Sequence, residues 1–173
     1  RSFISRKNPF SIIRCFKRLI KENKNHNHNP VLIIKTQGNN IPLSLNNDFQ
    51  KMLDELEDKV IVINKLMSDN EVRNLIRVCD CYISLHRSEG FGRGMAEAMS
   101  LGRPVIATRY SGNLDFMDDS NSFLVDYDLV DVGEGEYPHG SGQKWARPNE
   151  DQAFEFMRKI MTDRDLRKKI EAK

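Results

Sequence analysis

Short apolar runs alternate with longer amphipathic stretches along most of this chain. The runs are apolar at almost every position, which is typical of strands buried on both faces of a parallel sheet. The stretches between them repeat apolar residues every three or four positions, as helices with one buried face do. The runs predict strands at residues 31–34, 60–63, 82–85, 104–107 and 123–125.

Helix-start signals precede several of the amphipathic stretches. Asn8 and Pro9 open the first, because asparagine is a good N-cap and proline fits the first helical turn. Ser68 and Glu71 have the spacing of a capping box at the start of another. The predicted helices span residues 9–23, 48–58, 69–79, 94–101, 150–161 and from 163 onward. Residues 126–147 show no clear period and are expected to be irregular.

Strands that alternate with helices predict an α/β fold, a Rossmann-like doubly wound parallel sheet with helices on both faces. Ligands of such sheets bind beyond the carboxyl ends of the strands. The loops after Ile34, Ile63, Leu85 and Ala107 should therefore share one rim. Functional side chains are expected along this rim.

Composition narrows the class of protein. The chain has 173 residues, 39% of them hydrophobic and 30% charged, which suits one soluble globular domain or half of a two-domain enzyme. Lys and Arg number 27 against 25 Asp and Glu, and this balance argues against a nucleic-acid-binding protein. The three cysteines suggest reduced thiols, and the polar start has no signal-peptide pattern, so we expect a cytoplasmic location. Without an initiator Met, the sequence is interpreted as an excised fragment.

The segment at residues 86–99 carries the candidate chemistry. Its glycines allow backbone amides to approach a ligand, and the helix that follows offers free N–H groups and a positive dipole end. This combination favours a phosphate group. Glu89 and Glu97 flank the same turn, and carboxylates would repel phosphate but accept hydrogen bonds from sugar hydroxyls. A nucleotide sugar satisfies both requirements.

Other motifs fit less well. The Walker A pattern is absent, and Gly90-x-Gly92-x-Gly94 is not the dinucleotide fingerprint. The pair His26-x-His28 has no third metal ligand near it in sequence. The D-x-D spacing at residues 126–128 is interpreted as a coincidence, because it follows the late fifth strand rather than the phosphate turn. No metal site is predicted.

The run at residues 88–108, with Glu89 and Glu97 eight positions apart, resembles the E-x(7)-E signature of the family 4 retaining glycosyltransferases. The resemblance extends over nearly all of the chain. It includes the segments SRKNPFSIIRCF, YSGNLDFM, VGEGEYPHG and WARPNEDQA. It implies the C-terminal half of a GT-B enzyme, in which two Rossmann-like domains enclose the active site.

Residues 1–173 would then form the nucleotide-sugar (donor) binding domain, lacking its first strand, with the N-terminal acceptor domain absent. On the family's pattern Lys7 neutralises the donor diphosphate, Glu89 is the catalytic residue that contacts the transferred sugar, and Glu97 holds the ribose. His86, on the same rim, is either a structural histidine or a donor contact. The remaining donor-binding positions are Gly90, Phe91, Gly92 and Arg93 around the sugar and diphosphate, and Asn64, Lys65 and Leu66 at the base. The family's usual arginine, about five residues before the lysine, is replaced by Ser2, which follows Arg1.

The function implied by this resemblance is metal-independent, retaining transfer of a sugar from a UDP- or GDP-sugar to a glycan or lipid-linked acceptor. The donor is a substrate, and no cofactor is expected. The acceptor would bind through the missing domain, through which many relatives also contact the inner face of a membrane. The fragment alone would bind donor without transferring sugar. Two alternatives stay open: another GT-B enzyme, such as an epimerase or phosphorylase, and a non-catalytic nucleotide-binding module.

Overall fold

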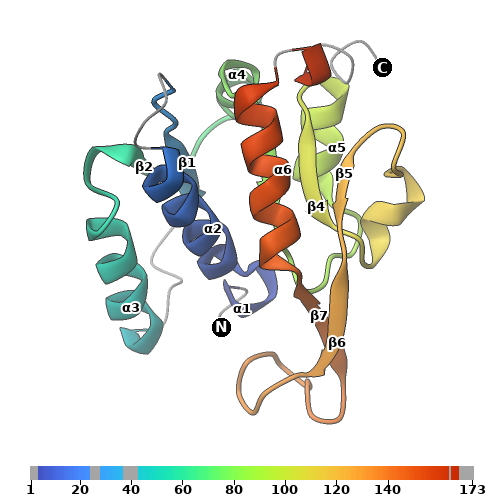
Figure 1. Cartoon of the computed structure of the whole chain (residues 1–173). Helices are drawn as coiled ribbons and strands as arrows, with labels where there is room; N and C mark the ends of the chain where they lie inside the picture. The colour runs from blue at the N-terminus through green and yellow to red at the C-terminus, as the bar shows by residue number, and fades with distance from the viewer. Residues whose placement is uncertain (1–3, 24–27, 37–42, 164, 168–173) are drawn as a thin grey trace.

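Helices and strands alternate along the computed structural model of this chain, which describes residues 4–23, 28–36, 43–163 and 165–167 (Figure 1). The helices are α1 (Ile4–Lys7), α2 (Pro9–Glu22), α3 (Leu43–Asp54), α4 (Asp69–Val78), α5 (Arg93–Ser100) and α6 (Glu150–Thr162). The strands are β1 (Leu32–Thr36), β2 (Val60–Asn64), β3 (Tyr82–Ser84), β4 (Val105–Thr108), β5 (Phe123–Val125), β6 (Tyr127–Asp131) and β7 (Lys144–Pro148). Short 3-10 helices lie at η2 (Glu57–Lys59) and η3 (Gly112–Asp115).

The strands form two parallel groups and one antiparallel pair. β1 pairs with β2, and β4 lies between β3 and β5, all in parallel register. β6 and β7 form an antiparallel hairpin. Parallel strands joined through helices confirm the predicted α/β fold with a Rossmann-like arrangement.

Strand β4 separates two hydrophobic clusters. Because successive side chains of a strand point to opposite faces, Ile106 enters one cluster while Val105 and Ala107 enter the other. The first cluster contains the buried faces of α2, α3 and α6, and the second contains those of α4 and α5. Figure 1 shows α2 and α6 side by side in front of the strands. The sheet therefore carries helices on both faces.

The expectation that every apolar strand is fully buried is correct only for β4. All residues of β1 and β3 are partly exposed, and β2 exposes Ile61 and Val62. In the described part of the chain β1 pairs only with β2 and β3 only with β4, so each leaves one edge open. Such open edges agree with a domain that lacks one strand, which stays a prediction.

The hairpin β6–β7 corrects the expectation that residues 126–147 are irregular. Each of its strands carries two charged residues rather than an apolar run, and packing against the loop after β3 buries Trp145 and Ala146. The amide of Ala146 donates to Arg87 O at 2.9 Å, and the guanidinium of Arg87 lies 4.7 Å from the Trp145 ring centre. In Figure 1 the hairpin extends below the parallel strands, on the side where β5 ends.

The helix boundaries follow the predicted signals with one shift. The capping box of α4 is present, with Ser68 accepting from the Glu71 amide and the Glu71 carboxylate accepting from the Ser68 amide. The helix predicted at 48–58 spans Leu43–Asp54 instead, and the left-handed φ of 49° at Glu57 follows its end. Of the helix predicted from 163 onward, residues 165–167 are helical and the rest lies outside the described residues.

Two further features concern the whole described chain. None of its helices combines the length and the apolar character that crossing a bilayer requires. Cys15, Cys79 and Cys81 are free thiols, and burial raises the pKa of Cys15 to about 12. That thiol is therefore protonated and packs as a small apolar group at neutral pH.

We predict that Phe154→Ala destabilises the fold strongly. Phe154 is 1% exposed in the cluster shared by α2, α6 and the sheet, and removing a buried ring costs about 3–5 kcal/mol of unfolding free energy. Val78→Ala is the control, because Val78 is 76% exposed and its truncation should cost less than about 0.5 kcal/mol. Chemical denaturation of both variants measures the difference, and equal costs would contradict this account of the core.

Candidate functional site

An ion pair at the carboxyl end of β3 joins two of the predicted site residues. The ammonium of Lys7, at the end of α1, donates to Glu89 Oε2 in the turn between β3 and α5. The two residues are 82 positions apart in sequence. The fold thus brings together the cation and the carboxylate that the sequence predicts to act on one ligand.

Arg6 is a second cation at this carboxylate, and sequence reasoning did not identify it. Its Nη1 atom lies 3.2 Å from Glu89 Oε1 and donates to Ser88 O at 2.8 Å. The guanidinium therefore spans the start of the turn. Its only signal in the sequence is its position next to Lys7. Arg1 and Ser2, where the family's second cation was sought, lie outside the described residues.

Backbone contacts hold α1 along this turn. The amide of Arg87 donates to Arg6 O at 2.8 Å. Asn8 does not cap α2 with its side chain as expected; it adopts a left-handed φ of 50°, and its Nδ2 atom donates to Leu85 O at 2.9 Å. The buried Asn8 side chain thereby fixes the segment that carries Lys7 to the end of β3.

The electrostatic environment keeps Glu89 ionised. Partial burial by itself would raise the pKa of this carboxyl, but the hydrogen bond and charge of Lys7, together with Arg6, lower the pKa below its ordinary value. The side chain of Glu89 is 11% exposed, whereas that of Lys7 is 51% exposed. Glu89 is therefore an ionised carboxylate kept in place by its two cations, and Lys7 is the partner that solvent or a ligand can reach.

Glu97 faces the same region from α5. Its Oε1 atom accepts from Arg93 Nε at 2.9 Å, one helical turn earlier. Burial raises the pKa of Tyr82, and the negative charges of both Glu89 and Glu97 raise it further. Both acids therefore act on one phenol, whose hydroxyl lies so close to Gly94 that a Cβ there would be 2.4 Å away.

The glycine turn leads directly into the N-terminus of α5. Gly92 precedes the helix with a φ of 93°, and a side chain there would meet Met95 at 2.5 Å. Gly90 has open space where a Cβ would lie. The Phe91 ring is 56% exposed and lies 5.0 Å from that of Phe116. The amides of Met95 and Ala96 donate to Gly92 O at 2.9 and 3.0 Å, whereas the two amides before them have no earlier helical carbonyl to donate to, which suits an anion.

The predicted base-binding loop lies at the end of β2, in the other parallel group. The Thr36 hydroxyl donates to Asn64 Oδ1 at 3.0 Å, and Lys65 lies 3.7 Å from Glu71. Leu66 is 76% exposed. These residues stand at a carboxyl strand end, as expected, and their role at the base stays a prediction.

Residues 1–131 match the family model described as glycosyl transferases group 1. The chain belongs to this family. No curated protein matches the chain in sequence. The fold matches the C-terminal Rossmann-like domains of GT-B glycosyltransferases.

Three solved structures illustrate the likeness. The C-terminal domain of LpcC, a group 1 family glycosyltransferase from Francisella tularensis, matches with a TM-score of 0.70 and 22% identity over 96% of this chain and 74% of that one. WaaG, a glycosyltransferase involved in lipopolysaccharide biosynthesis, matches with a TM-score of 0.69 and 20% identity, over 99% of this chain and 39% of WaaG. HepE from Anabaena, in complex with UDP and glucose, matches with a TM-score of 0.65 and 16% identity, over 96% of this chain and 38% of HepE. This chain thus spans about two-fifths of WaaG and HepE.

His86 has no exposed surface in this group 1 glycosyltransferase domain. Its Nε2 atom lies 3.0 Å from Tyr110 O and 3.2 Å from Asn113 Oδ1, so it carries the proton, and Nδ1 lies 3.0 Å from the Ser84 hydroxyl. Both ring nitrogens are used inside the protein. These contacts give His86 a structural role, and a donor contact by His86 stays a prediction.

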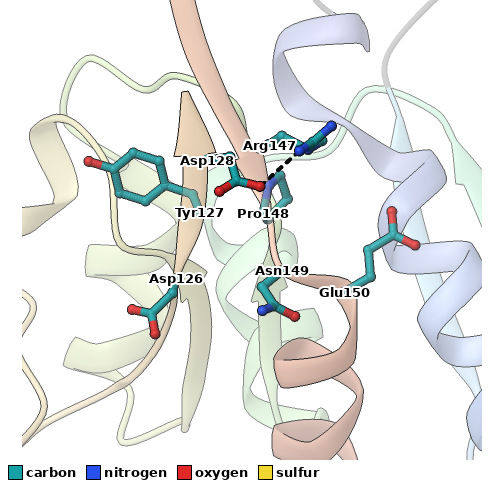
Figure 2. Close-up of a pocket in the computed structure, with 7 residues that line it drawn as sticks. All are labelled: Asp126, Tyr127, Asp128, Arg147, Pro148, Asn149 and Glu150. Carbon is teal, nitrogen blue, oxygen red and sulfur yellow. Dashed lines mark hydrogen bonds and ion pairs between the residues drawn. The ribbon is translucent and has the colours of Figure 1, made fainter. Parts of the chain in front are cut away.

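The acidic D-x-D segment lines a different cavity of this glycosyltransferase domain, between the hairpin and α6. Its volume is about 310 Å³, and Figure 2 shows its lining residues: Asp126, Tyr127, Asp128, Arg147, Pro148, Asn149 and Glu150. Asp126 pairs with Arg109 at 3.1 Å, and Asp128 pairs with Arg147 at 2.8 Å. Both carboxylates are thus used in ion pairs.

Metal-ligand groups are absent from the part of the chain that the structure describes, where no three His, Cys, Asp or Glu side chains could hold one ion. His28 is described, but His26 lies outside the described residues. The expectation that this pair is a poor metal site therefore stays a prediction.

We predict that the buried His86 makes this domain less stable in mild acid. Burial lowers the pKa of His86 below its ordinary value of 6.5, so above that pH the imidazole is neutral in both states. As the pH falls below it, the unfolded chain binds a proton that the folded protein rejects, and stability is lost. Denaturation between about pH 7.5 and pH 5.5 should show this loss. His86→Gln should show a smaller pH dependence, and an unchanged slope would contradict a buried neutral His86.

Proposed function

We propose that this chain is the donor-binding domain of a retaining, metal-independent glycosyltransferase. The enzyme moves a sugar from a UDP- or GDP-sugar to a glycan or lipid-linked acceptor, which binds through an N-terminal domain. It acts in the cytoplasm, at the inner face of the membrane. The observation that carries the proposal is the meeting of Lys7 and Glu89 beside the start of α5.

The charges at this turn suit a nucleotide sugar. The half-exposed ammonium of Lys7 and the N-terminus of α5 offer positive charge to a diphosphate, whose negative charge grows as the glycosidic bond breaks. Glu89 is the carboxylate next to this position and accepts hydrogen bonds from the transferred sugar. Glu97, within the helix, accepts from the ribose hydroxyls.

The structural neighbours favour UDP as the first nucleotide to test. HepE has been solved in complexes with UDP and with UDP-glucose. WaaG takes part in lipopolysaccharide biosynthesis, and this supports a glycan attached to lipid as the acceptor class. The base contacts in this proposal come from Asn64, Lys65 and Leu66 at the end of β2.

We predict that Lys7→Ala weakens UDP binding about 10- to 100-fold, because a charge-assisted contact to phosphate is lost. Lys17→Ala is a matched control: its side chain is also 51% exposed and also pairs with a glutamate, Glu55, but on a distant face of α2. Isothermal titration calorimetry with UDP and GDP measures both variants. Equal affinities for the wild type and Lys7→Ala would refute the diphosphate role.

We predict that Glu97→Gln weakens binding of UDP and UDP-sugars alike, by about 10-fold, because the ribose loses an ionised acceptor. Glu155→Gln is the control, since Glu155 also pairs with an arginine of its own helix, Arg158, at 2.6 Å. A Glu97→Gln variant that loses affinity only for the sugar-bearing donors would assign this carboxylate to the transferred sugar instead.

A further inference from the structure

The turn after β4 holds both backbone polar groups of Glu89. The amide of Glu89 donates to the Ser111 hydroxyl at 2.8 Å, and the amide of Gly112 donates to Glu89 O at 3.1 Å. These contacts cross from one strand end to the next and join residues 22 positions apart or more.

Gly112 touches the backbone of the next residue in the glycine turn. A Cβ at Gly112 would lie 1.7 Å from Gly90 O and 2.5 Å from Gly90 C. Backbone atoms cannot swing aside as a flexible side chain can. Any larger residue at position 112 must therefore displace Gly90, and with it the segment that begins at Glu89.

Ser111 occupies a backbone conformation that disfavours side chains. Its φ is 72° and its ψ is −151°, and this strained conformation aims the hydroxyl at the Glu89 amide. A glycine would adopt the same conformation with less strain. The hydroxyl is therefore the property that distinguishes serine from the easier residue at this position.

Buried contacts fix the turn at residues 110–113, called the 110–113 turn below, to the body of the domain. Asn113 has no exposed surface, and its Nδ2 atom donates to Thr108 O at 3.1 Å. The neutral His86 donates to Tyr110 O, and the Thr108 hydroxyl donates to His86 O at 2.7 Å. The 110–113 turn is thus attached to β4 and to the residue where the glycine turn starts.

We propose that Ser111 and Gly112 are positioning residues for Glu89, which hold its backbone so that the carboxylate points at the transferred sugar. This inference rests on the function proposed above. Lys7 is drawn to the diphosphate when the donor binds, so one of the two cations at the carboxylate leaves it. The 110–113 turn and Arg6 then keep Glu89 in place. Ser111 acts through Glu89 and needs no contact with the donor.

The test separates binding of the sugar from binding of the nucleotide. Calorimetry measures the affinities of UDP, UDP-glucose, UDP-galactose and UDP-N-acetylglucosamine for the wild type, and the sugar with the largest gain over UDP is the probe. In Ser111→Gly and Ser111→Ala this gain should fall about 5-fold or more, while UDP itself binds within about 2-fold of the wild type. Ser111→Gly relieves the strained backbone, and its retained UDP affinity shows that the variant is folded.

Ser122 supplies the control for the Ser111 variants. Ser122→Ala removes another 2.8 Å bond between a serine hydroxyl and the backbone, in which Ser122 donates to Asp118 O, and should leave the sugar gain unchanged. Full sugar preference in Ser111→Gly, equal weakening of UDP and UDP-sugar, or no sugar gain in the wild type would each overturn the positioning role. Absence of any binding of UDP, GDP or their sugars by the wild type would instead refute the proposed function itself.

Discussion

The placement of Lys7 and Glu89 at one turn is the arrangement on which the proposed site depends. It exists because α1 lies along the loop after β3, where the amide of Arg87 meets the carbonyl of Arg6. A helix of four residues, such as α1, has no stability of its own. Its place is therefore set by tertiary contacts, above all by the buried amide side chain of Asn8 at Leu85. The cation reaches the rim through the packing of the whole domain.

Strand β4 supplies the rigid frame for these contacts. It is buried at every position, and its two faces enter different hydrophobic clusters. The loop after β3 and the loop after β4 consequently start from neighbouring, paired strand ends. This explains how the two turns can meet as closely as Gly90 and Gly112 do. Helices α2 and α6 pack on one face of β4 and α4 and α5 pack on the other, so both faces of the strand are covered.

The sequence predicts helices and strands correctly where the signal is local. The apolar runs predict β4 and β5, the Ser68–Glu71 capping box predicts α4, and the glycine turn predicts the start of α5. The hairpin β6–β7 was not predicted because its strands carry charges and because contacts distant in sequence, such as that with Arg87, bury Trp145. Arg6 and Ser111 were not predicted as site residues, because their contacts with Glu89 join residues 83 and 22 positions apart in sequence. Exposure of β1 and β3 depends on which strands they pair with, and a single strand's composition does not encode that.

In the function proposed above, the same geometry lets a carboxylate stand beside a diphosphate. Two anionic groups at one turn repel each other unless each keeps a cation. Arg6, with an 18% exposed side chain, stays at Glu89, whereas the half-exposed Lys7 can exchange one anion for another at little cost, because surface ion pairs are weak. The backbone of Glu89 is held independently by Ser111 and Gly112. In the proposed function, the mobile charge of Lys7 meets the leaving group and the fixed charge of Glu89 faces the sugar.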